Sequence, residues 1–201
     1  MSSLTRLLLL VCAAPSVASG LQDYVLVPAD SHTTPPHAQV SVLKGLGGYT
    51  RLHGHWNGRV ARVQNAAQVF RVLPPIGGCT ADSGQRSRTS ENAKANKCAL
   101  AVNGSPFHVE SGACMGQSVA NGVPVCADCV PTPMSFGLRR GASNSTWVLG
   151  QLDYATSSEL GLSEVIVGQP PGWLVYNGTS AVSTKGGRVA PRTALALWVC
   201  H

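Results

Sequence analysis

The sequence predicts an α+β domain with a β-rich mixed sheet and few helices, stabilised by disulfides. Three observations support this prediction. Short apolar segments recur along the chain, and glycines and prolines, 22 and 13 in number, separate them at short intervals. One segment alone has the pattern of a helix. Six of the seven cysteines lie beyond the first 19 residues, and an even number is typical of a disulfide-bonded domain.

The first 19 residues have the pattern of a secretory signal peptide. Arg6 supplies the basic n-region, residues 7–14 form an apolar core, and Val17-Ala18-Ser19 is a small-residue cleavage site before Gly20. The apolar core is too short to span a bilayer, and no later segment is long enough, so we expect no membrane span. A secreted chain reaches an oxidising compartment, either the Golgi lumen or the extracellular space, where disulfides form.

Residues 20–39 are expected to form an extended leader, because they have little periodic apolar content and contain Pro35 and Pro36. Residues 40–201 then form one domain, which is long enough to bury a sizeable core. The net charge of +6 is spread thinly along the chain, and it falls by one when Arg6 leaves with the signal peptide. Basic and aromatic residues do not interleave, which argues against a nucleic-acid partner.

The expected strands are short apolar runs between turn residues. They span residues 68–73, 98–102, 135–138, 147–149, 165–167, 173–176 and 193–199. The expected helix spans residues 91–97, with Ser90 as N-cap, Glu91 near its start and lysines near its end. A core strand is an unusual last element of a chain, so we expect the natural domain to continue beyond His201 and residues 40–201 to be an incomplete domain.

The stretch from Cys98 to Gly116 is the most informative part of the sequence. Its apolar start, which we interpret as a buried strand, ends at Asn103-Gly104, a turn signal, and Pro106 prevents a simple continuation of the ladder. A polar turn at the end of a buried strand is a place where many folds keep their chemistry. An ordinary hairpin corner beside a disulfide is the alternative interpretation.

Cys126 and Cys129 have the C-x-x-C spacing of zinc sites and thiol oxidoreductases. No second cysteine pair completes a zinc site, and prolines on both sides disfavour the helix of an oxidoreductase motif. We therefore expect a local disulfide or two separate disulfide partners. His53 and His55 would share one face of a strand but lack an evident third ligand, so we expect an exposed polar face, with neither a metal nor another cofactor.

Asn144 and Asn177 each begin an N-glycosylation sequon in a polar, turn-like segment, and we expect both to be modified. Asn103 also begins a sequon, but Pro106 follows it directly, so we expect it to stay unmodified. Arg192 stands at the start of an apolar run, where a guanidinium is costly unless it is paired. Its planar fork suits a carboxylate or phosphate, and an exposed arginine at a strand end is the alternative.

Nine segments, taken in order and spacing, resemble the phosphodiester glycosidase family. They span residues 58–62, 69–74, 77–79, 89–97, 98–103, 111–116, 135–138, 175–178 and 191–194. The resemblance implies a β-rich fold with helices in the secretory pathway. It also implies hydrolysis of an α-N-acetylglucosaminyl, or similar sugar, phosphodiester to free sugar and a phosphomonoester. The partner is then a sugar phosphodiester, which includes such a group on the glycan of a glycoprotein.

The resemblance also assigns residues by position. Asn103 and Gly104 match the family's Asn-Gly or Asn-Ala turn, and Arg192 matches its Arg-Thr pair. Cys79 and Cys114 match cysteines that look paired with each other in the family. These matches imply a disulfide between Cys79 and Cys114 and a site that includes Asn103 and Arg192.

The chemistry of such a reaction suggests a role for each group. The leaving phosphate is already a stabilised anion, so the site must stabilise an oxocarbenium-like transition state, neutralise the phosphate and activate water or a nucleophilic carboxylate. Arg192 suits the phosphate. Asn103, with the turn at Gly104 and Ser105, suits binding of sugar hydroxyl or acetamido groups. Glu110 is the carboxylate nearest to this turn in the sequence, although no family motif supports it.

Two departures from the family are visible. The family continues Asn103-Gly104 with Gly-Phe-Phe, whereas Ser105-Pro106-Phe107 stands here; serine tolerates positive φ poorly, and proline lacks a backbone donor. The family's Asn-x-Asp-Gly-Gly-Gly-Ser turn does not occur in this sequence. A catalytically inactive, secreted module that binds carbohydrate phosphate is therefore the alternative function. A third reading is an unrelated disulfide-stabilised surface domain, in which Asn103 and Arg192 lie far apart.

Overall fold

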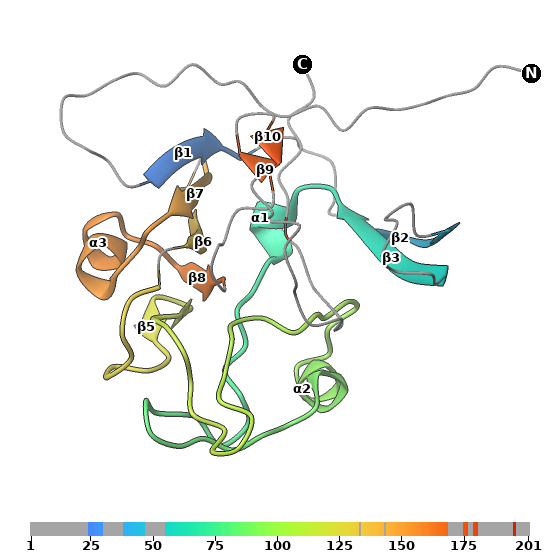
Figure 1. The fold of residues 1–201 in the computed structure, drawn as a ribbon. Helices are drawn as coiled ribbons and strands as arrows, with labels where there is room; N and C mark the ends of the chain where they lie inside the picture. The colour runs from blue at the N-terminus through green and yellow to red at the C-terminus, as the bar shows by residue number, and fades with distance from the viewer. Residues whose placement is uncertain are drawn as a thin grey trace, which may run out of the picture.

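The computed structural model describes residues 24–29, 38–46, 55–132, 134–142, 144–168, 175–176 and 179–180, together with residue 195. It confirms the β-rich α+β class. Six strands form one sheet in the order β1-β7-β6-β8-β4-β5, and all strand pairs in the described part of the chain are antiparallel (Figure 1). These strands are β1 (Tyr24–Pro28), β4 (Val119–Ala120), β5 (Val123–Pro124), β6 (Ser135–Arg139), β7 (Thr146–Gly150) and β8 (Glu164–Val167).

Two further strand pairs and three short helices complete the regular structure of the described residues. The pairs are β2 (Ala38–Leu46) with β3 (His55–Val63), and β9 (Val175–Tyr176) with β10 (Thr179–Ser180). The helices are α1 (Ala66–Val69), α2 (Thr89–Ala95) and α3 (Tyr154–Glu159). A long, mostly irregular segment connects α1 to β4 and carries α2 (Figure 1). None of the helices in the described ranges is long and apolar enough to span a membrane.

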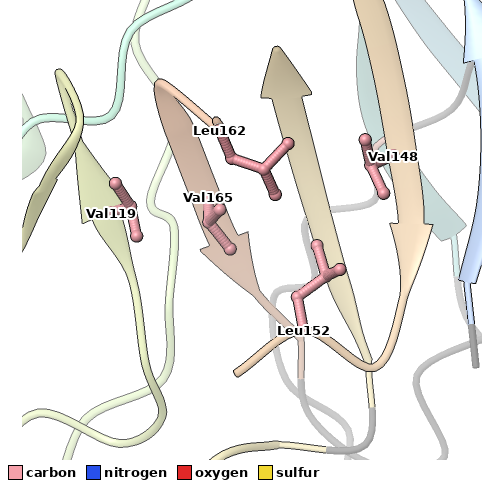
Figure 2. Packing of buried hydrophobic residues seen from close by; sticks show 5 residues of the cluster. All are labelled: Val119, Val148, Leu152, Leu162 and Val165. Atoms are coloured by element: carbon pink, nitrogen blue, oxygen red, sulfur yellow. The ribbon is translucent and has the colours of Figure 1, made fainter. Parts of the chain in front are cut away.

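One face of the sheet packs against the segments that flank α3. Its buried cluster comprises Val119, Val148, Leu152, Leu162 and Val165 (Figure 2). Gly137 of β6 lies between Val148 and Val165 in the strand register. A Cβ atom at Gly137 would lie 3.1 Å from Leu162 Cδ1 and 3.2 Å from Leu152 Cδ1. The glycine therefore gives the two leucines room to pack on the centre of the sheet.

The other face of the sheet packs against α1 and the residue that follows it. Phe70, Phe136 and Trp147 form an aromatic cluster with ring centroids 5.0–5.9 Å apart, two of the three pairs in edge-to-face geometry. Ala67 of α1 and Leu138 of β6 are buried beside Trp147. Because both faces of the central strands are covered, these strands are apolar along most of their length.

An ion pair between a half-buried arginine and a fully buried glutamate fastens α1 to the sheet. Glu164, at the start of β8, is fully buried, and Arg140 Nη1 donates to its Oε1 at 2.8 Å. The same guanidinium donates to the carbonyl oxygens of Ala67 and Phe70, while the Val72 amide donates to Glu164 Oε2 at 2.8 Å. Arg140 thus satisfies carbonyl groups near the end of α1, and Glu164 accepts the Val72 amide. Together they hold residues 70–72 against the sheet.

Several sequence predictions are confirmed. The strands expected at residues 135–138, 147–149 and 165–167 correspond to β6, β7 and β8, each with one or two more residues. The expected helix is α2, but Ser90 is not its N-cap. The Arg88 amide donates to Glu91 Oε2 at 3.0 Å, and the helix begins at Thr89. Glu91 thus satisfies a backbone donor before the first turn, so the helix starts earlier than predicted.

Two expected strands are wrong. Residues 68–73 include the end of α1 and an irregular segment, because Arg140 binds the Phe70 carbonyl and Glu164 binds the Val72 amide in place of a neighbouring strand. Residues 98–102 form bends and irregular backbone. Leu100 and Val102 are 40% and 51% exposed, so this run is not a buried strand. Its apolar residues therefore gave a misleading signal of burial.

Other predicted segments are described only in part. Residues 175–176 of the expected strand 173–176 form β9, and residues 173–174 lie outside the described part. Of the expected strand 193–199, only Leu195 is described, and it lies outside any strand. Within the segment expected as an extended leader, residues 24–28 form β1, which pairs with β7 over its whole length. Main-sheet structure therefore begins before residue 40.

The N-terminus of α3 gives a testable prediction. Asp153 is the N-cap, its Oδ1 accepts the Thr156 amide at 2.7 Å, and this backbone hydrogen bond lowers the pKa of the Asp153 carboxyl. We expect Asp153→Ala to lower the free energy of unfolding by about 1 kcal/mol at pH 7. The charged form contributes stability above the unfolded-state pKa of about 4, and this contribution is lost as the pH falls through the lower folded-state pKa.

Urea unfolding of the wild type and the variants at pH 7 and pH 3 measures both the loss of stability in Asp153→Ala and its dependence on pH. Asp153→Asn keeps an acceptor oxygen but no charge, so its difference from the wild type should shrink as the pH falls. An equal difference at both pH values would show that the Asp153 charge does not matter.

The buried pair gives a second prediction. We expect Arg140→Ala to lower the free energy of unfolding by roughly 3–5 kcal/mol, because it leaves the buried Glu164 carboxylate without its charged partner. Arg71 is the control: its Nε lies 4.0 Å from Glu164 Oε1 and its side chain is 48% exposed. We expect Arg71→Ala to cost less than about 1 kcal/mol. Denaturant unfolding of both variants measures these changes in the free energy of unfolding. Similar decreases in the two variants would contradict the role given to Arg140.

Candidate functional site

The segment expected as a turn at Asn103-Gly104 is irregular backbone that bends at Ser105, and it lies against the end of β8. We call residues 103–105 the Asn103 turn. The Val167 amide donates to Ser105 Oγ at 3.2 Å, and Ser105 Oγ lies 2.6 Å from Ser118 Oγ. A Cβ atom at Gly104 would lie 2.7 Å from Ile166 Cδ1. Asn103 is exposed. The turn therefore approaches the last residues of β8 closely, with Asn103 at the protein surface.

The sequence raised the question whether Ser105, where the family has glycine, must adopt a positive φ, and the structure shows that it does not. Neither Gly104 nor Ser105 has a positive φ, whereas Asn65, Lys97 and Asn121 do. Ser105 therefore sits in a conformation that serine adopts readily. Gly104 serves close approach to Ile166 rather than a left-handed turn.

A disulfide and tight backbone packing fix the segment that follows the turn. Cys79 and Cys114 are bonded, with their Cα atoms 5.6 Å apart, as the family resemblance implies. The Cys114 amide donates to Thr80 O at 2.9 Å, and Phe107 forms a bridge with Cys114. Gly112 has a φ of +72° and leaves no room for a Cβ beside the Gly84 carbonyl. The turn is thus tied to the segment before α2.

The C-x-x-C motif forms a local disulfide between Cys126 and Cys129, one of the two alternatives that the sequence leaves open. Tyr154 holds this loop: its hydroxyl oxygen accepts the Cys126 amide at 3.1 Å and donates to the Cys126 carbonyl oxygen. Burial raises the pKa of the Tyr154 hydroxyl, so it is protonated and able to donate at neutral pH. Both cysteines are buried, which suits a structural role.

The predicted site residues are described unevenly. Asn103 lies beside β8, whereas Arg192 lies outside the described residues, so the predicted convergence of the two stays a prediction. Glu110 is exposed in the Pro106–Met115 loop, and its carboxylate takes part in neither ion pair of the described residues.

Of the two predicted glycosylation residues, Asn144 is exposed between β6 and β7. Asn177 lies outside the described residues.

Sequence reasoning missed three features of this region. Ser118 is buried and contacts Ser105, and no local signal identifies it. Asn121-Gly122 forms the turn between β4 and β5 with φ values of 50° and 77°, and this dipeptide is a recognised hairpin signal. Glu164 is a lone charge before an apolar run, the same pattern that drew attention to Arg192.

The arrangement offers hydrogen-bonding chemistry and no evident metal centre. Across the described ranges, no three His, Cys, Asp or Glu side chains are grouped so that they could hold a metal ion. The Asn103 carboxamide can both donate to and accept from a polar ligand. A rigid strand end and a disulfide-tied loop hold the turn that carries it.

No protein-family model matches the chain. Curated relatives are the N-acetylglucosamine-1-phosphodiester alpha-N-acetylglucosaminidases of Bos taurus and Homo sapiens, each 32% identical over 127 residues, and that of Mus musculus, 30% identical over 126 residues. The match covers 60–61% of this chain but only 23% of each relative.

A solved structure supports the fold. It is the catalytic domain of the zebrafish N-acetylglucosamine-1-phosphodiester alpha-N-acetylglucosaminidase, auto-inhibited by its pro-peptide, with a TM-score of 0.60 and 24% sequence identity. The alignment covers 74% of this chain and 48% of that chain. Together with the curated relatives, this likeness confirms that the chain resembles the phosphodiester glycosidase family of the N-acetylglucosamine-1-phosphodiester alpha-N-acetylglucosaminidases, in sequence and in fold.

Proposed function

We propose that this chain forms part of a hydrolase that cleaves an α-N-acetylglucosaminyl, or similar sugar, phosphodiester. Water adds to the anomeric carbon, the bond from that carbon to the phosphate oxygen breaks, and free sugar and a phosphomonoester leave. The observation that carries the proposal is the 30–32% identity to three curated enzymes named for this activity. The chain spans 23% of their length, so the activity of the whole relative is extended here as a proposal.

The proposal assigns a role to each candidate residue. Asn103 binds a sugar hydroxyl or the acetamido group, and Gly104 and Ser105 shape the turn that presents it. Arg192 binds the departing phosphate with its bidentate fork. Glu110 is the candidate carboxylate for water activation, and it is exposed at a loop, where a general base lacks a fixed position.

The alternative proposal is a catalytically inactive module that binds the same sugar phosphodiester. The reason for this alternative is that the 201 residues contain no Asn-x-Asp-Gly-Gly-Gly-Ser sequence. Binding of an α-N-acetylglucosaminyl phosphodiester without release of free sugar would favour this alternative. Neither binding nor turnover would favour an unrelated surface domain.

The activity prediction compares the 201-residue protein with a longer protein that also carries the coding sequence downstream of residue 201. If that sequence supplies the acidic turn, we expect the longer protein to release free sugar from methyl (N-acetyl-α-D-glucosaminyl) phosphate. Arg192→Ala should lower its rate about a hundredfold or more, because a phosphate charge is then left uncompensated. Arg192→Lys should recover part of the rate, because lysine lacks the planar fork.

Two controls make this assay decisive. Arg139→Ala removes an exposed arginine at the end of β6 and should leave the rate unchanged. The 201-residue protein should not turn substrate over, because it lacks a carboxylate that the family resemblance supports. Turnover by this protein would contradict the prediction, and Glu110→Gln would then test the carboxylate nearest to Asn103 in the sequence.

We also propose that the chain is made in the secretory pathway, cleaved before Gly20 and glycosylated at Asn144 and Asn177. The exposed position of Asn144 between two strands and the two disulfides support this proposal. In protein from an animal secretory host, Asn144→Gln and Asn177→Gln should each remove one N-glycosidase-sensitive mobility shift. Asn103→Gln should remove none, because Pro106 follows its sequon. A shift that depends on Asn103 would contradict this assignment.

A further inference from the structure

We propose that Ser105 is a positioning residue: its hydroxyl fastens the Asn103–Gly104 turn to the end of β8 and so presents Asn103 to a sugar phosphodiester. The part about the ligand rests on the proposed function. The part about the fastening rests on the hydrogen bonds of Ser105 alone. In this proposal Ser105 acts by holding the turn that carries Asn103, and it does not contact the substrate.

The first step concerns the backbone of β8. This strand pairs with β4 at one position, Val119 with Val165. Val167 lies two residues further along β8, beyond that pair, and its amide donates to Ser105 Oγ. The Ser105 hydroxyl therefore takes the place of a neighbouring-strand carbonyl. Val167 is 4% exposed, so its amide has little access to a replacement water molecule.

The second step concerns the donor capacity of Ser105. One of the two hydroxyls, Ser105 or Ser118, donates to the other across 2.6 Å, and Ser118 is 5% exposed. If Ser105 donates to Ser118, it accepts from Val167 at the same time, and its single hydrogen is used. Its hydroxyl is then engaged inside the protein on two sides. This arrangement suits a fastening group better than a substrate ligand.

The third step concerns what the fastening holds. Gly104 lies so close to Ile166 that a Cβ there would meet Cδ1 at 2.7 Å, so the turn is already seated on β8. On the other side of Ser105, Pro106 restricts the backbone, and its carbonyl oxygen accepts the Met115 amide at 3.0 Å. Asn103 is the exposed residue two positions before Ser105. Restricting this short segment lowers the entropy that Asn103 would lose on binding a ligand.

The experiment uses the isotope-labelled 201-residue protein and methyl (N-acetyl-α-D-glucosaminyl) phosphate as the probe. In Ser105→Ala we expect the Val167 amide to exchange with solvent at least about tenfold faster, because its acceptor is gone. The Gly104 order parameter should fall from the range of rigid backbone, and the Kd for the probe should rise about five- to tenfold. Ser105→Thr keeps a hydroxyl and should restore all three quantities.

Matched measurements separate a local effect from a general one. Ser158→Ala removes an exposed serine hydroxyl in α3 and should change none of the three quantities. Exchange at Val148, in the core, should stay unchanged in every variant and so reports that the fold is intact. Adding Ser118→Ala to Ser105→Ala should have less effect than Ser118→Ala alone, because the two hydroxyls act on each other.

The possible outcomes distinguish the two parts of the proposal. Unchanged Val167 exchange or an unchanged Gly104 order parameter in Ser105→Ala overturns the fastening. Faster exchange with an unchanged Kd overturns the positioning of Asn103 for the ligand. If the wild-type protein does not bind the probe, the proposed function fails for this chain, and the exchange and order-parameter measurements still decide whether Ser105 fastens the turn.

Discussion

The pair of the half-buried Arg140 and the fully buried Glu164 is the constraint on which the arrangement of the sheet and its flanking segments depends. Two opposite charges are stable in an apolar interior only when each is paired and its remaining hydrogen-bonding positions are used. Here those positions are taken by backbone groups of α1 and of Val72, and by the Asn121 amide at 3.4 Å. The pair therefore joins β8 to α1 and to the β4–β5 turn at one point.

The same strand, β8, connects this constraint to the candidate site. Glu164 begins the strand and anchors it on the face covered by α1, whereas Val167 ends it and binds Ser105. Between them, Val165 is fully buried in the cluster under the α3 segments. A strand held at its start, its centre and its end offers little freedom of movement. The Asn103 turn is therefore seated on a strand that is held along its whole length.

The sequence predicted the parts of the fold whose signal is local and failed where the decisive partner is distant. Residues 135–138, 147–149 and 165–167 are apolar because they lie in the middle of a covered sheet, and their composition shows it. Residues 68–73 have a similar composition, but Arg140, about 70 positions away, donates to the Phe70 carbonyl oxygen, and Glu164 accepts the Val72 amide. Residues 98–102 are apolar and partly exposed, so composition alone misjudged their burial.

The candidate site was predicted to a similar extent. Turn chemistry and the family resemblance located Asn103, and the resemblance implied the Cys79–Cys114 bond. Neither could show that Ser118 and Val167, 13 and 62 positions from Ser105, complete the hydrogen bonds of its hydroxyl. Where the family has Gly-Phe, this chain has Ser105-Pro106, in a backbone conformation that needs no positive φ. The Ser105 hydroxyl, bonded to the Val167 amide, is therefore compatible with the place of the turn beside β8.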